Sequence, residues 1–251
     1  MVNDMSAKDT IEKNSLRNNT LDLTQGNVTR RLLTFAIPVF LGNLFQLFYS
    51  LADTRIVGSA LGERALAAVG ATSVLCNLMI GFMNGMALGF AIPVARDYGA
   101  KDEKKLKETV GNIIVIGCVM TLLFTVGTLV FMDGLLGWMN ISAELYADAK
   151  AYICIIIGGM FATFAYNAAA GILRAVGDIV APLGFLVLSS VLNVVMDLWF
   201  IYGFDLGVAG AAYATVLAQV ISAVLCIIYM IWRYEIFRLK IKDLRLIKDT
   251  A

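Results

Sequence analysis

A single aspartate, Asp197, stands inside the apolar stretch VLSSVLNVVMDLWFIYGF, where a charge is costly. Asn193 precedes it by one helical turn, and an amide can hydrogen-bond a carboxyl in either protonation state. The plain alternative is a structural hydrogen bond between helices, worth only about 0.6 kcal/mol on average in a membrane. A buried ionised carboxylate needs more compensation than that, because desolvation favours its neutral form. We therefore interpret Asp197 with Asn193 as a candidate proton or sodium site.

A second aspartate, Asp53, ends an earlier apolar run, in NLFQLFYSLADTRIVG. Polar residues spaced by three, four and three positions share one helical face with it. This stripe consists of Asn43, Gln46, Ser50 and Asp53. Tyr49 lies on a flank of the same face. A polar stripe on an apolar helix indicates a bundle interior or a water-filled cavity. The alternative is that Asp53 lies at the headgroup level and pairs with Arg55.

The residue types that are missing exclude most other chemistry. The chain contains no histidine, which excludes histidine-ligated metals, histidine-activated nucleophiles and imidazole proton relays. It has no HExxH, GxSxG or P-loop motif, and its net charge of +1 indicates no nucleic-acid partner. We expect a protein that is not an enzyme, with no metal or organic cofactor and only H⁺ or Na⁺ as a bound ion.

The elements that must position these groups are membrane helices. Of the 251 residues 59% are hydrophobic and only 16% are charged, which indicates a polytopic membrane protein in a lipid bilayer. A spanning helix needs about 20 apolar residues. Six such runs occur, at 32–52, 65–95, 109–132, 151–173, 179–204 and 206–232. The sequence therefore predicts an all-α membrane protein with six transmembrane helices.

Basic residues alternate between the connections of these spans. The segment before the first span and the connections after the second, fourth and sixth hold five, five, one and six Lys and Arg, against three in the opposite loops. The positive-inside rule then places both termini in the cytoplasm of a cell with this protein in its cytoplasmic (inner) membrane. We expect a cytoplasmic segment at 1–31, a six-helix domain at 32–232 and a basic cytoplasmic linker or tail at 233–251. The stretch 233–246 is either a helix on the membrane surface or a solvated stop.

Proline and glycine mark two further features. Pro38 lies six residues into the first span, removes a backbone hydrogen bond and permits a kink, so we expect a helix hinge there. Gly81, Gly85 and Gly89 form two overlapping GxxxG units, which predict a close-packing helix face.

Several of these segments, in order, resemble the N-terminal half of multidrug and toxic compound extrusion (MATE) transporters of the MOP superfamily. The opening segment TQGNVTRRLLTFAIPVFLGNLFQLFYSLADTRIVGSALGERALAAVGA is similar to the family's first helix. ARDYGAKDEKK resembles its first cytoplasmic loop, GILRAVGD its turn between the fourth and fifth helices, LNVVMDLWFI its fifth helix and GVAGAAYATVLAQ the start of its sixth. The resemblance covers about residues 24–232.

The resemblance implies one six-helix lobe of a twelve-helix transporter that exports drugs and organic cations against an inward H⁺ or Na⁺ gradient. It places ion coupling at Asp53, Asn193 and Asp197, and the hinge at Pro38. Cavity residues are then Tyr49, Thr215 and Asn167, with Gln46 from the polar stripe.

A full family member needs roughly twice this length. The chain is therefore expected to be either a truncated product, inactive without a second lobe, or a half that pairs with a second six-helix lobe in trans. A lipid-precursor flippase of the same superfamily is the alternative function, but it calls for a more cationic cavity than spans with almost no Lys or Arg provide. A membrane enzyme that uses the two aspartates has no nucleophile, base or metal constellation to support it.

Overall fold

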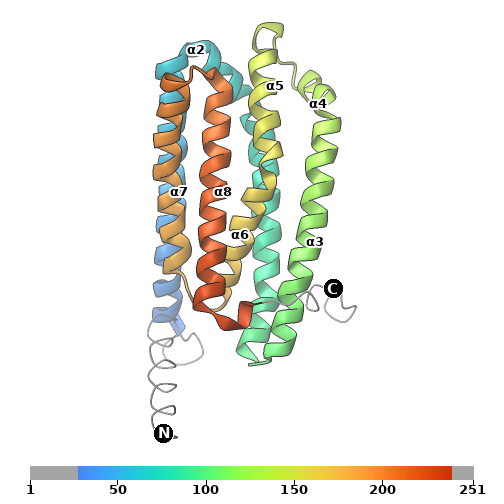
Figure 1. The fold of residues 1–251 in the computed structure, drawn as a ribbon, viewed down its shortest axis with the longest axis vertical. Helices are drawn as coiled ribbons and strands as arrows, with labels where there is room; N and C mark the ends of the chain where they lie inside the picture. Colours follow the sequence, from blue (N-terminus) through green and yellow to red (C-terminus); the bar gives the residue numbers. More distant parts are fainter. Residues whose placement is uncertain (1–27, 239–251) are drawn as a thin grey trace, which may run out of the picture.

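The computed structural model describes the backbone of residues 28–238 and their side chains, apart from those of residues 28–32, 34 and 35. Its first element, α2 (Val28–Gly99), consists of two helical limbs that meet at Gly62. Gly62 has φ +83°, a conformation that costs glycine little and other residues much. The first limb rises beside α7 and the second returns in the opposite direction (Figure 1).

The α-helices that follow are α3 (Glu103–Val130), the short α4 (Met132–Trp138), α5 (Ala143–Gly158), α6 (Met160–Ala175), α7 (Val180–Leu198) and α8 (Gly207–Arg233). The long helices among them follow in alternating directions when α5 and α6 are taken as one (Figure 1). A π-helical turn, η1 (Trp199–Gly203), extends α7, and a 3₁₀ turn, η2 (Glu235–Phe237), follows α8. Helices α5 and α6 form one bent unit, with an angle of 42° across Gly159.

The helices cross a membrane six times. Four are long and apolar enough to span, and the bent pair α5–α6 provides a fifth candidate. The apolar part of α2, Ala36–Gly99, has 64 residues, which would extend about 96 Å at 1.5 Å per residue. A hydrocarbon core is about 30 Å thick, so the two limbs of α2 make separate crossings. The prediction of six transmembrane helices is confirmed.

The connections that together hold most of the basic residues gather at one end of the bundle, which we call the basic end. The α2–α3 turn, the α6–α7 turn and the end of α8 all lie there, at the lower end of Figure 1. Gly62, α4 and the α7–α8 connection lie at the opposite end. The two ends of the bundle therefore divide the loops into the same two groups as their Lys and Arg counts. The segments 1–27 and 239–251 lie outside the described residues, as does most of the stretch 233–246, for which a surface helix and a solvated stop are the alternatives.

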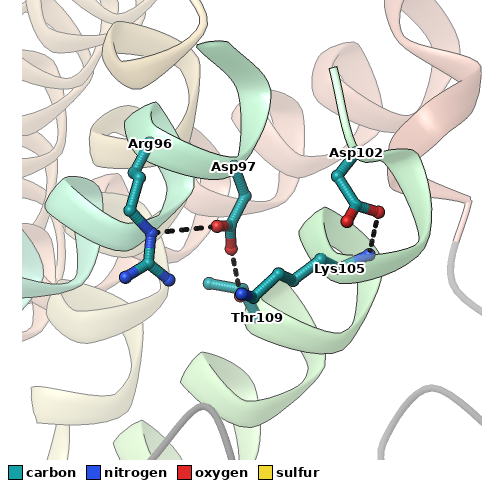
Figure 2. A network of polar contacts seen from close by, with 5 residues as sticks. All are labelled: Arg96, Asp97, Asp102, Lys105 and Thr109. Atoms are coloured by element: carbon teal, nitrogen blue, oxygen red, sulfur yellow. Dashed lines mark hydrogen bonds and ion pairs between the residues drawn. The ribbon is translucent and has the colours of Figure 1, made fainter. Parts of the chain in front are cut away.

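Two buried carboxylates hold the basic end together. Asp97 of α2 accepts a hydrogen bond of 2.6 Å from the Thr109 hydroxyl of α3 and one of 3.1 Å from Arg96 Nε (Figure 2). In the same turn the Asp102 side chain caps α3 by accepting from the Lys105 N–H at 3.0 Å. These bonds satisfy a helix N-terminus and fix the two antiparallel helices relative to each other.

Asp178, the second buried carboxylate, connects the start of α7 with the end of α8. Its Oδ2 accepts from the hydroxyls of Tyr229, at 2.9 Å, and Tyr234, at 3.1 Å, and its Oδ1 accepts from the Ala181 N–H at 3.2 Å. Burial and the nearby Asp178 raise the pKa of Tyr234 above its usual range. Phe237, just beyond, is buried among residues of α3, α6 and α8. The chain that leaves α8 is therefore fixed against the bundle as far as η2.

The glycine face predicted for close packing is open instead. A Cβ added at Gly81, Gly85 or Gly89 would meet no atom within 4 Å. Gly85 lines an apolar groove between α2 and α3 of about 440 Å³. The prediction of a packed GxxxG face is wrong for this chain, because the spacing shows which residues share a face but not what lies opposite.

Candidate functional site

A cavity of about 1010 Å³ runs through the bundle between the two limbs of α2, α5, α6, α7 and α8. The polar stripe of the first limb faces it: Asn43, Gln46, Ser50 and Asp53 all line its wall. Four other predicted residues also line it, namely Pro38, Tyr49, Asn167 and Thr215. The spacing of the stripe thus identified the wall of a cavity.

The two aspartates meet at the wall of this cavity. The carboxyl groups of Asp53 and Asp197 lie within hydrogen-bonding reach of each other. Asp53 faces the cavity, whereas Asp197 lies behind it with no exposed surface. The structure contains no ion pair between Asp53 and Arg55 among the residues it describes. Asp53 therefore lies beside Asp197 and does not pair with Arg55.

Asn193 bonds the deeper carboxyl, and Thr215 bonds Asn193. With its amide oriented to satisfy both neighbours, Asn193 donates to Asp197 Oδ2 at 2.9 Å and accepts from the Thr215 hydroxyl at 3.1 Å. Asn193 is 1% exposed, so its contact with Asp197 is shielded from solvent. The Tyr49 hydroxyl also bonds the Thr215 side chain. Thr215 of α8 thereby connects α7 with the first limb of α2.

One oxygen of each carboxyl lacks a donor. Oδ1 of Asp53 and Oδ1 of Asp197 are buried without a hydrogen-bond partner in the described part of the chain. Two carboxylates accept but do not donate, so a hydrogen bond between them requires a proton on one. A small cation held by the oxygens of the carboxyl pair and Thr215 would satisfy the same atoms. Among residues 28–238 no three His, Cys, Asp or Glu side chains form a metal-ligand cluster.

Sequence reasoning missed Tyr152 of α5. Its ring is 9% exposed, lines the cavity and lies close enough to Asp53 to sense its charge. Tyr146 lies six residues earlier, near the start of the same helix, and donates to Asp133 instead. Both tyrosines lie in one apolar helix, so the sequence does not show which of them is near the carboxyl pair. Only the packing of α5 against α2 places Tyr152 there.

The remaining predicted residues lie further from the pair. Gln46 and Asn167 line the cavity without a hydrogen bond to another described residue. Pro38 precedes Asp53 by 15 residues, about 22 Å along the helix. The backbone of α2 stays helical through Pro38, and its break lies at Gly62. The hinge role of Pro38 stays a prediction.

Residues 38–199 match the family model described as MatE. The chain belongs to the MatE family. It is 30% identical over 210 residues to the "Probable multidrug resistance protein YpnP" of Bacillus subtilis, an alignment that covers 84% of this chain and 47% of that protein. It is 26% identical over 216 residues to the "Multidrug export protein MepA" of Staphylococcus aureus, covering 86% of this chain and 48% of that protein.

The fold agrees with this MatE assignment. A solved structure described as the outward-facing conformation of a multidrug resistance MATE family transporter of the MOP superfamily superposes with a TM-score of 0.78 at 30% identity. The match covers 87% of this chain and 48% of that one. The chain thus spans about half the length of the curated relatives that it matches. The MatE match includes both carboxyls of the pair and ends before Thr215.

Proposed function

We propose that this chain is one lobe of an ion-coupled antiporter that exports drugs and organic cations across the cytoplasmic membrane by alternating access. The observation that carries the proposal is the Asp53–Asp197 pair on the wall of a large cavity. Its relatives are named for multidrug resistance and multidrug export. The cavity wall combines apolar surface with polar side chains, as expected for amphipathic ligands.

The coupling chemistry follows from the exposure of the two carboxyls. Asp53 faces the cavity and can attract an organic cation, and Asp197 lies behind it as the more protected acceptor. A proton or Na⁺ entering the pair neutralises the charge that holds the cation. The ion and the organic cation therefore compete for the pair, so the affinity for one depends on whether the other is bound. Such a difference in affinity is what an ion needs to shift a conformational equilibrium.

The packing of the first limb of α2 offers a route for the change. A Cβ added at Gly42 would lie 3.5 Å from the side chains of Leu183 and Leu186, so α2 and α7 already touch there. Pro38 lies one turn before this contact, where the helix lacks one backbone hydrogen bond. Occupancy of the pair, which bonds α2 to α7, alters the contact between the helices, and Pro38 provides the position at which α2 bends.

A second six-helix lobe completes the transporter in this proposal, since transporter cavities form between related repeats. The basic end lies in the cytoplasm by the positive-inside rule, with both chain ends on that side. The described residues lining the cavity include one guanidinium, that of Arg174, and one carboxyl, that of Asp53. This balance weighs against a lipid-precursor flippase, which needs a cationic cavity.

The test is dye efflux from energised vesicles that contain this chain together with a second six-helix lobe. An imposed H⁺ or Na⁺ gradient should drive efflux of a cationic dye, and Asp53→Asn or Asp197→Asn should abolish it. Asp205→Asn is the matched control, because Asp205 is exposed at the end opposite the basic end and its φ of +52° suits asparagine. Unchanged efflux and unchanged ion dependence in both variants of the pair would contradict the proposal.

A further inference from the structure

Arg174 lies at the other end of the same cavity. It belongs to the last turn of α6, at the basic end, and its side chain lines the cavity together with Ile179 and Pro182 of the α6–α7 region. Asp197 follows Val180, the first residue of α7, by 17 residues, about 26 Å along the helix. The cavity therefore has a guanidinium near one end and the carboxyl pair toward the other.

No side chain neutralises Arg174. No hydrogen bond or ion pair joins it to another residue in the range 28–238. The titratable groups that interact with its charge are the Tyr166 phenol and the Cys226 thiol. Tyr166 already donates to the Pro182 carbonyl at 3.0 Å, and Cys226 is buried. Its guanidinium thus keeps all five N–H donors available.

The nearest carboxylate in the sequence is already occupied. Asp178 follows Arg174 by four residues, but its oxygens accept from two tyrosine hydroxyls and a backbone N–H. Arg174 is half-buried, and a partly desolvated guanidinium without a counter-charge is costly, while its planar donors match a carboxylate or phosphate. The cost is recovered when an anionic oxygen group binds.

We propose that Arg174 forms an anion-binding subsite at the basic end of the cavity, which takes the carboxylate or phosphate oxygens of an amphipathic ligand. The inference rests on the proposed function in one respect, namely that the cavity admits such ligands. The distance to the carboxyl pair is longer than a drug-sized molecule, so one ligand does not reach both ends. Arg174 therefore binds the acidic group of a zwitterionic ligand at an entry position, before its cationic group reaches Asp53.

Rhodamine B and its ethyl ester test this subsite, because they differ only in a free carboxylate. Binding of each dye to this chain in detergent is measured by fluorescence anisotropy for the wild type, Arg174→Gln and Arg174→Lys. Arg174→Gln should weaken rhodamine B by about tenfold and change ester binding less than twofold. Arg174→Lys, which keeps the charge without the planar fork, should fall between them. Arg96→Gln is the control, since Arg96 lies at the same end but does not line the cavity.

A competition experiment with lipid distinguishes a lipid phosphate from the carboxylate of the ligand as the bound anion. In nanodiscs, added phosphatidylglycerol should compete with rhodamine B in the wild type but not in Arg174→Gln if a lipid phosphate occupies the subsite. No competition assigns it to the carboxylate of the ligand. Equal losses for both dyes in Arg174→Gln, or an unchanged affinity for rhodamine B, would overturn the subsite. Asp53→Asn should weaken binding of the ester. If it does not, the proposed function is contradicted but the Arg174 subsite is not.

Discussion

Gly159, at the bend between α5 and α6, is a position where one methyl group should have a measurable effect. A Cβ there would lie 2.4 Å from Cγ2 and 2.7 Å from Cγ1 of Val216 on α8. Valine has a stiff χ1, so these methyl groups cannot turn away freely. Val216 follows Thr215, which contacts both Asn193 and Tyr49. Gly159→Ala therefore pushes α8 at the residue that connects the two sides of the site.

The size of the effect follows from the overlap. Overpacking of this kind costs about 1–3 kcal/mol. The backbone of Gly159 has φ −81°, which alanine adopts without strain, so no backbone cost is added. At about 2–4 °C per kcal/mol for a chain of this size, the midpoint of thermal unfolding should fall by about 2–12 °C. Val216→Ala removes both contacting methyl groups and should restore most of that loss.

Thermal unfolding of the purified chain in detergent, followed by circular dichroism, measures the double-mutant cycle of Gly159→Ala and Val216→Ala. Gly158→Ala is the matched control, because a Cβ at this neighbouring residue would meet nothing within 4 Å. The coupling between Gly159→Ala and Val216→Ala should be at least about 0.5 kcal/mol. If Gly159→Ala is as stable as Gly158→Ala, or if Val216→Ala does not rescue it, the described crossing of α6 and α8 is wrong.

Three further outcomes can be measured on the same preparation. Asp178→Ala removes the acceptor of three hydrogen bonds and should lower the free energy of unfolding by about 2–4 kcal/mol, whereas a neutral result would contradict the network. Gly85→Ala should not destabilise the chain, since its Cβ would meet open space, and a loss above about 1 kcal/mol would show a packed face. Hydrogen bonds from Lys150 and Tyr146 hold the pKa of Asp133 below its ordinary 3.8, so this contact between α4 and α5 adds stability above that pH and loses it as the pH falls through the lower value. Trp138 fluorescence should report that acid transition in the wild type. If the transition persists in Asp133→Asn, its assignment to Asp133 is wrong.

The helices and the polar stripe could be predicted because a bilayer leaves few choices. Backbone groups in hydrocarbon must bond within their own segment, so an apolar run of sufficient length is a helix. Helical spacing then placed Asn43, Gln46, Ser50 and Asp53 on one face, and this face lines the cavity. Local composition and period were sufficient for both results.

The joint of α2 could not be predicted in the same way. The stretch DTRIVGSALGER is polar enough to resemble a loop, yet the helix continues through Asp53 and breaks only at Gly62. The pairing of Asp53 with Asp197 likewise depends on how α2 packs against α7, which neither segment encodes alone. The same limit explains Tyr152 and the open glycine face at Gly85. In each case the spacing identified a face, and tertiary packing decided its neighbour.

The central claim is that one site, the Asp53–Asp197 pair, binds either the coupling ion or an organic cation. Its most direct test is the affinity of this chain in detergent for tetraphenylphosphonium, measured against pH at fixed Na⁺ and against Na⁺ at fixed pH. One bound ion predicts that affinity falls by up to about tenfold per unit of falling pH, or per tenfold rise in Na⁺, and that Asp53→Asn with Asp197→Asn removes the dependence. An affinity that neither pH nor Na⁺ changes, or a dependence that survives in the double variant, would contradict the claim.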